Sequence, residues 1–286
     1  MKNIVKNESD PIIIRSRKKL DLKIQQLSKE EAIDFIRTYH YSKVIPRLCC
    51  YFLGIYENSR LLGVVELGWG TQPLQTIRKI FPNHNLLTED YLEIGKMCFI
   101  PEMNYNKYFG SYALAFLIRW VREYTNCIFL YTLADGIEGK CGYVYQASNF
   151  YYCGYFKTSV YRDKETGEKI HPRSARKLLE ENAKYDGVKK RYWLTHSFCE
   201  YKGIEKINGF MFRYIYPLTK EADVILKYYK NYIRHSYPKD KNLLFERRID
   251  NRKYEKIAQP KFNRHVDRYN SQDFNKYMER RKNEIL

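Results

Sequence analysis

The 286-residue sequence contains no apolar run of the roughly 18 residues that a membrane-spanning helix requires. Its first residues, MKNIVKNESDPIII, have neither the apolar stretch nor the small-residue cleavage site of a signal peptide. We therefore expect a cytoplasmic protein with no membrane partner.

A disulfide framework and a structural metal site are equally unsupported. The seven cysteines are odd in number and scattered, and they include the adjacent pair Cys49 and Cys50. There is no C-x-x-C and no H-E-x-x-H, the spacings typical of zinc sites. This pattern favours a reducing compartment and predicts no metal ligand set.

Positive charge and tyrosine, in contrast, are abundant. The chain has 51 Lys and Arg against 33 Asp and Glu, a formal net charge of +18, and 28 tyrosines. Such charge attracts polyanions, and aromatic rings among basic residues offer faces on which unstacked bases can lie. Nucleic acid is the leading partner, and the alternative is a basic chain whose charge serves only solubility.

Apolar periodicity predicts an α/β (α+β) protein with a mixed central sheet flanked by helices. Ser28 is typical of a helix N-cap, because the acidic residues of KEEAIDFIRTYH follow it directly. Asn58 and Ser59 lie where a hairpin should turn. We expect strands at 22–27, 50–57, 61–70, 92–101, 127–135, 151–156, 191–201 and 209–218, and helices at 29–40, 106–124, 144–150 and 174–185.

The composition divides the chain into three parts. Residues 1–19 form an N-terminal arm, 20–220 the catalytic domain, and 221–286 a basic, Tyr-rich C-terminal extension. The extension has 17 Lys and Arg against 10 Asp and Glu and few apolar clusters, so we expect it to be helical or partly disordered. It serves either as a solvated tail or as a grip on nucleic acid.

The stretch from Tyr131 to Gly154, YTLADGIEGKCGYVYQASNFYYCG, resembles the Mom family of phage DNA modification proteins. Members of that family have a strand ending in (S/T)xAD, a short loop with glycine, and then IYQAxNFxYxG. Further pieces match in the same order, so the resemblance spans about residues 30–215. The matching residues outside the stretch are His40, Tyr41, Ser42, Leu92, Glu93, Ser111 and the run His171-Pro172-Arg173-Ser174.

The resemblance implies a GNAT-like acyltransferase fold, whose order of strands and helices is also the order predicted above. It further implies a transferase that converts the exocyclic N6 amine of adenine in double-stranded DNA to a carbamoylmethyl (glycinamide) derivative. That modification protects phage DNA from restriction inside the host cell. Because a duplex hides this amine in a base pair, such an enzyme must flip the base or act on opened DNA.

Four residues are catalytic candidates on this resemblance. Asp135, at the end of a buried strand, is the candidate base, and its alternative role is an N-cap for the following turn. Tyr145 is the candidate acid or hydrogen-bond donor, and otherwise a core residue. His40 and Tyr41, which follow the first helix, are expected to reach the site; a lone histidine is otherwise a structural partner.

DNA contacts are expected from two groups of residues. Gln146 and Asn149 carry amides suited to an adenine edge, and Phe150 is a stacking candidate. Arg173, Lys189, Lys190 and Arg191 are candidate phosphate contacts, which give affinity without sequence choice. The sequence predicts no oligomeric state.

The activated acyl or aminoacyl donor is expected to contact Lys96, Gly110 and Ser111. Lys96 stands where related proteins have Arg. Lysine keeps the positive charge but cannot make the two parallel hydrogen bonds of a guanidinium group. Acyl-CoA-binding GNAT proteins hold pyrophosphate with a glycine-rich loop before the corresponding helix. Here only Gly110 of that loop is kept and Tyr112 stands at a position for a small residue, so aminoacyl-tRNA is an alternative donor to acyl-CoA.

Three other functions remain open on the sequence. A GNAT-fold N-acyltransferase for another amine, in tRNA, protein or a small molecule, would favour an intact CoA loop. A non-catalytic nucleic-acid-binding protein would need none of the candidate catalytic residues. An enzyme of the same fold that elaborates a different hypermodified base would share every feature described.

Overall fold

The structure is a computed structural model that describes residues 12–15, 21–42, 44–70, 73, 76, 80–171, 176–228, 236–266 and 269. The chain forms two compact units. Unit 1 comprises Met1–Ala134, Gly142–Gly154 and Phe212–Tyr237, and unit 2 comprises Asp135–Cys141, Tyr155–Met211 and Pro238–Leu286. The two units are defined by contacts in space, whereas the arm, catalytic domain and extension were predicted from composition, so that division stays a prediction.

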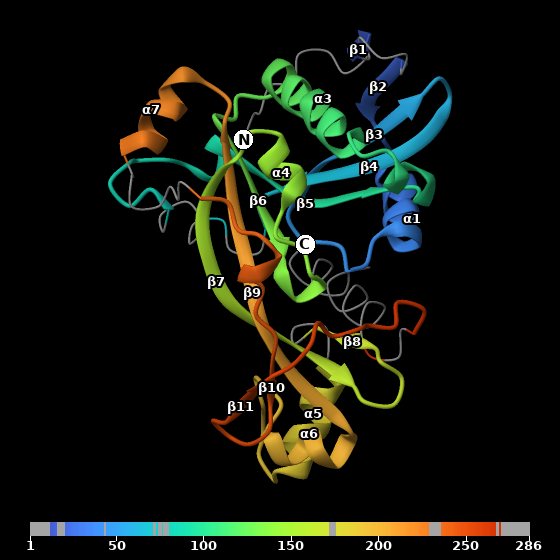
Figure 1. The fold of residues 1–286 in the computed structure, drawn as a ribbon, viewed down its shortest axis with the longest axis vertical. Coiled ribbons are helices and arrows are strands. Elements are labelled where there is room, and N and C mark those ends of the chain that lie inside the picture. Colours follow the sequence, from blue (N-terminus) through green and yellow to red (C-terminus); the bar gives the residue numbers. More distant parts are fainter. Residues whose placement is uncertain are drawn as a thin grey trace. The chain divides into compact units, whose positions relative to one another are not determined.

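Unit 1 is built on a mixed sheet in the order β1-β2-β3-β4-β5-β6-β9 (Figure 1). Neighbours from β1 to β5 are antiparallel, and β5 and β6 are parallel. The strand and hairpin predictions for this unit are confirmed, including the turn at Asn58, whose φ of 54° suits asparagine. The strands are β1 Ile12–Arg15, β2 Asp21–Gln26, β3 Cys49–Glu57, β4 Arg60–Gly68, β5 Tyr91–Phe99, β6 Phe129–Asp135 and β9 Ile204–Pro217.

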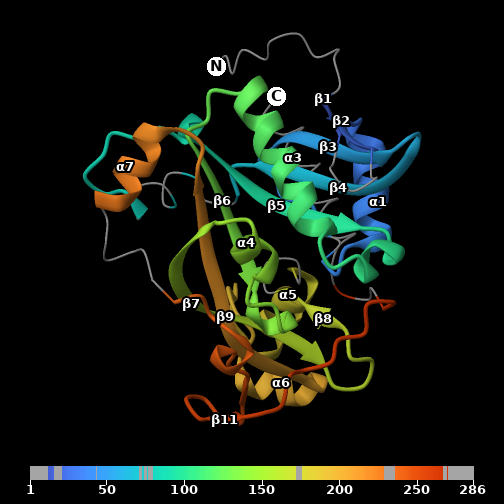
Figure 2. The same ribbon diagram turned by 45° about the horizontal axis from the view of Figure 1, so that its top comes forward.

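Helices cover the sheet of unit 1, as the amphipathic patterns predict. In α1 (Lys29–Tyr39), the Ser28 hydroxyl accepts a hydrogen bond from the Glu31 amide at 3.2 Å, which is the expected N-cap. The long helix α3 (Phe109–Tyr124) buries one apolar stripe and crosses the strands β3 to β5 in both ribbon views (Figures 1 and 2). The unit also contains α4 (Tyr143–Ala147), α7 (Lys220–Tyr228) and two 3-10 turns, η1 (Thr88–Asp90) and η2 (Pro101–Tyr105).

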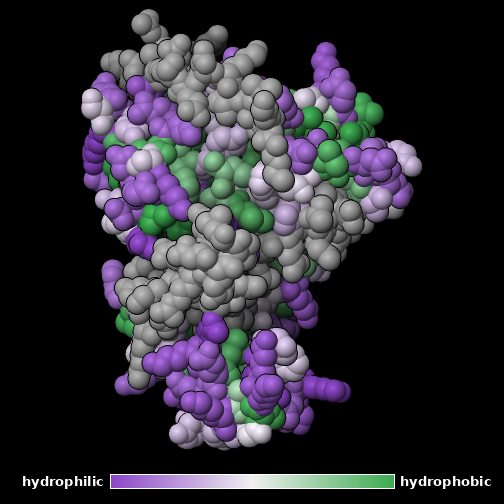
Figure 3. Space-filling model, turned by 180° about the vertical axis from the view of Figure 1, so that it is seen from behind, coloured by the Kyte–Doolittle hydropathy of each residue, from purple (hydrophilic) through white to green (hydrophobic). Residues whose placement is uncertain are grey.

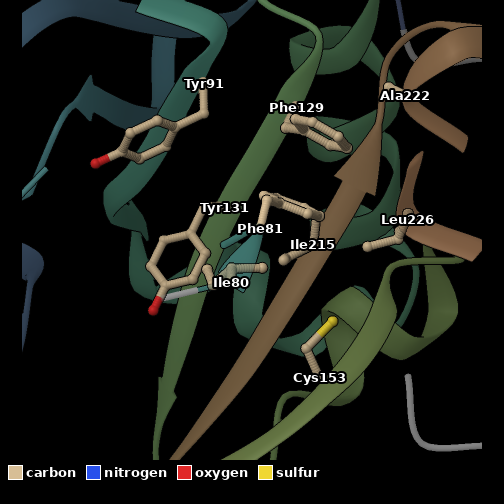
Figure 4. Close-up of a cluster of buried hydrophobic side chains, with 9 residues drawn as sticks. All are labelled: Ile80, Phe81, Tyr91, Phe129, Tyr131, Cys153, Ile215, Ala222 and Leu226. Atoms are coloured by element: carbon tan, nitrogen blue, oxygen red, sulfur yellow. The ribbon is translucent and has the colours of Figure 1, made fainter. Parts of the chain in front are cut away.

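A buried aromatic cluster joins the middle of this sheet to α7. Tyr91 of β5 and Tyr131 of β6 meet edge to face with ring centroids 6.3 Å apart, and Phe129 stacks on Phe81 at 4.7 Å (Figure 4). Ile215 of β9 completes the cluster from the next strand. This packing explains why the apolar run in 127–135 is continuous: the strand is covered on both faces.

The parallel pairing of β5 and β6 stops halfway along both strands. Tyr91 pairs with Phe129 at the start of the ladder, and Ile94 pairs with Thr132 at its last rung. Beyond that rung β5 continues to Phe99 beside β4 only. An opening between central strands at their carboxyl ends is where α/β sheets present reactive groups.

Unit 2 contains residues 155–163 of β7, residues 204–211 of β9 and two helices. The strand β7 (Tyr151–Asp163) pairs with β8 (Lys169–Ile170) and β9, and β9 pairs with β10 (Glu246–Arg248), which pairs with β11 (Tyr254–Lys256). The helices are α5 (Arg176–Tyr185), which was predicted, and α6 (His196–Lys202), with the 3-10 turns η3 (Gly136–Glu138) and η4 (Asp240–Asn242).

Two sequence predictions in unit 2 are wrong. The segment 191–201 is not a strand: its second half lies in α6, which buries Phe198 and Cys199, and the buried Leu194 precedes the helix. The part of the C-terminal extension that the structure describes is not only helical, because β10 and β11 form a hairpin on β9. β7 is also longer than the predicted strand 151–156.

Two further features concern the described residues as a whole. No helix within these ranges is both long enough and apolar enough to cross a membrane. All seven cysteines lie within them and are free thiols, five of them buried.

Candidate functional site

A β-bulge gathers charged side chains on one face of the unit 1 sheet. Lys96 pairs with Glu66 of β4, but the next rung joins Ile94 to Leu67, so Gly95 is an extra residue in β5. Residues three apart in a regular strand point to opposite faces. The bulge cancels that rule, and Glu66, Glu93 and Lys96 face the same side. We call these three residues the carboxylate cluster.

Glu66 lies at the bottom of the carboxylate cluster, with 1% of its surface exposed. A Cβ atom on Gly95 would lie 2.3 Å from its Oε2, so the bulge glycine makes room for the carboxyl group. Oε2 has no hydrogen-bond donor among the described residues. Burial raises the pKa of Glu66 to about 7, and the Cys49 thiol and Lys96 oppose the rise.

Glu93 lies on the accessible side of the carboxylate cluster. It is partly exposed, and its carboxylate lies against Gly70, where a Cβ atom would be 2.2 Å from Oε2. The positive φ of Gly70, 67°, also favours glycine there. Loss of hydration raises the pKa of Glu93 to about 7, with Lys96 opposing the rise. A carboxyl group that titrates near neutrality suits both acid and base catalysis.

The candidates His40, Tyr41 and Lys96 come together through Ser42. The buried Lys96 Nζ donates to Ser42 Oγ at 3.0 Å. His40 Nδ1 lies 2.9 Å from both the amide nitrogen and the carbonyl oxygen of Ser42, so the ring is held against the Ser42 backbone. Tyr41 stacks on the His40 ring at 4.3 Å. The end of α1 is therefore tied to the carboxylate cluster.

The two thiols beside the carboxylate cluster are not prepared as nucleophiles. Cys49 Sγ donates to the Pro46 carbonyl at 2.9 Å, and burial followed by the charge of Glu66 raises its pKa well above the usual range. Burial raises the pKa of Cys50 to about 12. Both thiols stay protonated near neutral pH, and thiolates rather than thiols attack.

Tyr145 lies at the point where β5 and β6 separate. Its ring is buried against Phe150 and Tyr214, with centroids 5.4 and 5.5 Å away. Burial raises the pKa of Tyr145, and a hydrogen bond with Thr132 opposes the rise. Thr132 in turn donates to the Ile94 carbonyl at 3.1 Å, on the last shared rung. Tyr145 therefore contributes to the core, as in its alternative role, while its hydroxyl is directed at the strand opening.

The three predicted base contacts, Gln146 in α4 and Asn149 and Phe150 after it, have different environments. Gln146 is buried and its Nε2 donates to the Tyr214 hydroxyl at 3.0 Å, and Phe150 is fully buried. Asn149 is exposed, with a φ of 59° just after the helix. In this conformation only Asn149 of the three presents its side chain at the surface, and base contact by all three stays a prediction.

The start of α3 does not have the form of a CoA-binding loop. The N-cap residue Tyr108 makes no side-chain cap, and the Ser111 hydroxyl donates back to the Tyr108 carbonyl at 2.9 Å. A Cβ atom on Gly110 would lie 2.8 Å from Val144 of α4, so α4 fills the space beside this glycine. These residues do not fit a pyrophosphate held by a glycine-rich loop, and donor contacts of Gly110 and Ser111 stay predictions.

Asp135 belongs to unit 2, where both of its oxygens have partners. Oδ1 accepts from the Ile137 amide at 3.0 Å as the N-cap of η3, and Oδ2 accepts from Lys169 Nζ at 2.9 Å. Lys169 also donates to Glu138 at 2.7 Å, and Arg264 approaches Glu138 at 3.2 Å. The capping role offered as the alternative is observed, and a role as base would require Asp135 to leave Lys169.

The predicted phosphate contacts lie in unit 2 or outside the described residues. Lys189 and Lys190 are exposed, whereas Arg191 is partly buried and donates to Asp186 at 2.7 Å. Arg173 falls outside the described residues. Within those residues, no group of three His, Cys, Asp or Glu side chains is arranged to hold a metal ion.

Sequence reasoning did not assign a role to Glu66 or Glu93. A signal was present for Glu66: it is an acid in the middle of the apolar run LLGVVELG, where an inward-facing charge has a large desolvation cost. Glu93 appears in the resemblance but only as a matching position. The bulge that brings Lys96 to them depends on pairing with β4 and leaves no mark in the spacing.

Comparison with known proteins assigns the family. The model of the Mom protein family matches residues 21–239, more than half of the chain. The chain belongs to the Mom protein family. The match includes the carboxylate cluster, the His40–Ser42 segment and α4. Membership of this family, together with the identity to a curated methylcarbamoylase, identifies the chain as a transferase.

One curated relative in the Mom family is the methylcarbamoylase mom of Escherichia phage Mu. It is 27% identical over 191 residues, which cover 66% of this chain and 76% of that protein. Among solved structures, the ribosomal-protein-S5-alanine acetyltransferase of Vibrio fischeri is 8% identical, with a TM-score of 0.39 over 73% of this chain and 98% of that one. An N-acetyltransferase from Staphylococcus aureus Mu50 is 15% identical, with a TM-score of 0.36 over 69% and 97%. The fold assignment rests on the observed order of elements.

Proposed function

We propose that the chain modifies the exocyclic N6 amine of adenine in DNA by transfer of a carbamoylmethyl (glycinamide) group, in the cytoplasm of a phage-infected host cell. Such a modification protects the DNA from restriction enzymes. The observation that carries the proposal is the family match over residues 21–239, which contains a cluster of carboxyl groups suited to proton transfer at neutral pH.

The reaction needs a base because the adenine amine is a weak nucleophile. Its lone pair is delocalised into the ring, so a proton must leave as the new bond forms. In our proposal Glu93 accepts that proton, because it is the less buried of the two carboxyl groups whose pKa is raised to about 7. The N6 nitrogen forms the bond to the donor carbon, and the leaving group departs with the electrons of the broken bond.

The other residues of the cluster position these groups. Lys96 places a positive charge beside both carboxyl groups and is bonded to Ser42. His40 and Tyr41 are linked to Lys96 through Ser42 and are candidate contacts of the substrate. A duplex must present adenine outside the stack, so we propose base flipping.

The donor is proposed to be an activated glycyl ester, with aminoacyl-tRNA as the candidate carrier. N6 would bond to the ester carbonyl carbon while the tRNA oxygen leaves with the electrons of the broken bond, and the glycyl amide so formed must then rearrange to its carbamoylmethyl isomer. Support comes from the filled space beside Gly110, which disfavours acyl-CoA, and from the net charge of +18, which suits a second polyanion.

Mass spectrometry of nucleosides tests this function. DNA from bacteria that express the chain should contain a deoxyadenosine derivative heavier by one carbamoylmethyl group, and DNA from cells with an empty vector should not. Soluble protein without any new nucleoside would contradict the proposal. A mass gain on another base would keep the transferase and reject adenine as its substrate.

A further inference from the structure

The loop between α5 and α6 of unit 2 displays aromatic side chains to solvent. Tyr192 and Trp193 are 69% and 61% exposed, and Tyr185 and Tyr201 are 48% and 68% exposed on the flanking helices. An exposed tryptophan next to an exposed tyrosine in one loop is unusual, since such rings are normally buried or held at interfaces. We call Tyr185, Lys189, Lys190, Tyr192, Trp193 and Tyr201 the aromatic surface.

This loop is held in place by partly buried hydrogen bonds. Asn182, fully buried, donates to Asp186 at 2.8 Å and accepts from the Thr195 amide at 2.7 Å. Asp186 also binds Arg191 at 2.7 Å. Leu194 anchors the end of the loop in the core of unit 2. The rings next to it are therefore displayed by a fixed loop, which lowers the entropy cost of binding.

Positive charge accompanies the rings. Lys190 Nζ lies 4.8 Å from the centre of the Tyr192 ring, and Lys189 is exposed beside it. Tyr185 and Tyr201 stack on each other at 5.0 Å. In the rear view of Figure 3, mostly hydrophilic residues cover the lower end, where Figure 1 shows α5 and α6. Flat rings with lysines between them match alternating bases and phosphates.

We propose that the aromatic surface binds an unpaired stretch of DNA strand, with bases on Tyr192 and Trp193 and phosphates near Lys189 and Lys190. The identity of the strand as DNA rests on the proposed function. A duplex offers its phosphates but not the faces of its bases, so stacking platforms favour opened DNA over paired DNA. A site of this kind would hold the strand that a base-modifying enzyme has opened.

Binding measurements on the full chain test this proposal. Fluorescence anisotropy with a single-stranded oligodeoxynucleotide should give tighter binding than with its duplex or with the RNA of the same sequence. Trp193→Ala together with Tyr192→Ala should weaken binding about 100-fold, about tenfold for each stacking platform lost, and Trp193→Phe alone should keep most of the affinity. Tyr105→Ala, at an exposed tyrosine of unit 1, is the matched control and should bind like the wild type.

Two further readouts separate stacking from charge. A bound strand that stacks on Trp193 should quench the tryptophan fluorescence of the chain. The change can be attributed to Trp193 because Trp120 is buried and Trp69 is only partly exposed. Lys189→Gln and Lys190→Gln should each lower the salt dependence of binding by a slope of roughly 0.7, the value for one phosphate of a single strand, and the control Lys220→Gln should not.

The proposal is overturned if the Trp193 and Tyr192 variants bind DNA like the wild type. Preference for RNA or for the duplex would overturn it as well, and so would binding to vesicles of anionic phospholipid without binding to DNA. None of these measurements requires modification of the strand. Absence of a modified nucleoside would therefore reject the proposed function and leave the binding result intact.

Discussion

Glu66 is an acid buried within an apolar strand, and its ionisation opposes folding. Its pKa rises from an ordinary value of 4.5 to about 7 because burial disfavours the charged form. Between these values the folded chain binds more protons than the unfolded chain, so stability falls as pH rises. Glu93, Lys96 and Cys49 lie near Glu66. The pKa of Glu93 is raised as well, so Glu93 also makes stability fall as pH rises.

We predict that Glu66→Gln reduces this pH dependence. Urea unfolding at about pH 5 and about pH 8 should show a smaller loss of stability in the variant than in the wild type. Glu123→Gln, at an exposed position of α3, is the control and should follow the wild type. An identical pH dependence in Glu66→Gln would show that Glu66 ionises in the folded chain at its ordinary pKa.

Lys169 holds two acids of unit 2 together. Its side chain is 16% exposed, and those of Asp135 and Glu138 are 12% and 5% exposed. Lys169→Met should cost about 3–5 kcal/mol in the free energy of unfolding, because it leaves both carboxylates without their shared ammonium group. Adding Glu138→Gln should recover part of the loss.

The matched control for Lys169 is an exposed ion pair of the same unit. Lys164 lies 3.2 Å from Glu200, and both side chains are about half exposed. Lys164→Met should change the free energy of unfolding by less than about 1 kcal/mol in the same urea experiment. Equal effects at the two lysines would contradict the importance assigned to burial around Asp135.

At the scale of elements, the bulge in β5 is the feature on which the site depends. Gly95→Ala places a Cβ atom 2.3 Å from Glu66 Oε2, and should cost about 1–3 kcal/mol. The same change in a Glu66→Ala background should cost less, because the clashing carboxyl group is gone. A double-mutant cycle from urea unfolding measures this difference, and strict additivity would contradict the contact.

Sequence patterns predicted most elements of unit 1 and fewer of unit 2. Strands β2 to β6 and helices α1 and α3 follow their apolar periods, because each has one clear partner surface. The prediction of a strand at 191–201 is wrong although aromatic residues favour strands. The exposed Tyr192 and Trp193 of this segment lie instead in a loop, and only Phe198 and Cys199 are buried by the helix.

The site was predictable only in part, for a similar reason. His40, Tyr41 and Lys96 were identified from matching motifs and do lie together. Their link to Glu66 required the single extra residue Gly95, which shifts the register of one strand against another. Such a shift depends on tertiary pairing and is invisible in local sequence.

At the scale of the whole molecule, the chain passes repeatedly between its two units. β7 and β9 have residues in both, and Asp135–Cys141 belongs to unit 2 although the residues on either side belong to unit 1. Composition along the chain cannot reveal such a division, since it averages over neighbours in sequence. The net charge of the chain, in contrast, follows directly from its composition.

The net charge of +18 predicts DNA binding that depends strongly on salt. If about six phosphates are contacted, affinity for duplex DNA should fall about 1,000-fold between roughly 50 and 200 mM salt. Fluorescence anisotropy at several salt concentrations measures the slope. A slope near zero would show that the basic residues do not contact the phosphates.

The most direct test of the account is the fraction of modified adenine in DNA from cells that express the wild type, Glu93→Gln or Glu123→Gln. Equal amounts of soluble, folded protein are the condition for comparison. We predict a modified nucleoside with the wild type and with Glu123→Gln, and about 100-fold less with Glu93→Gln, the loss expected for a general base. Wild-type levels in Glu93→Gln, or no modified adenine with any of the three proteins, would contradict it.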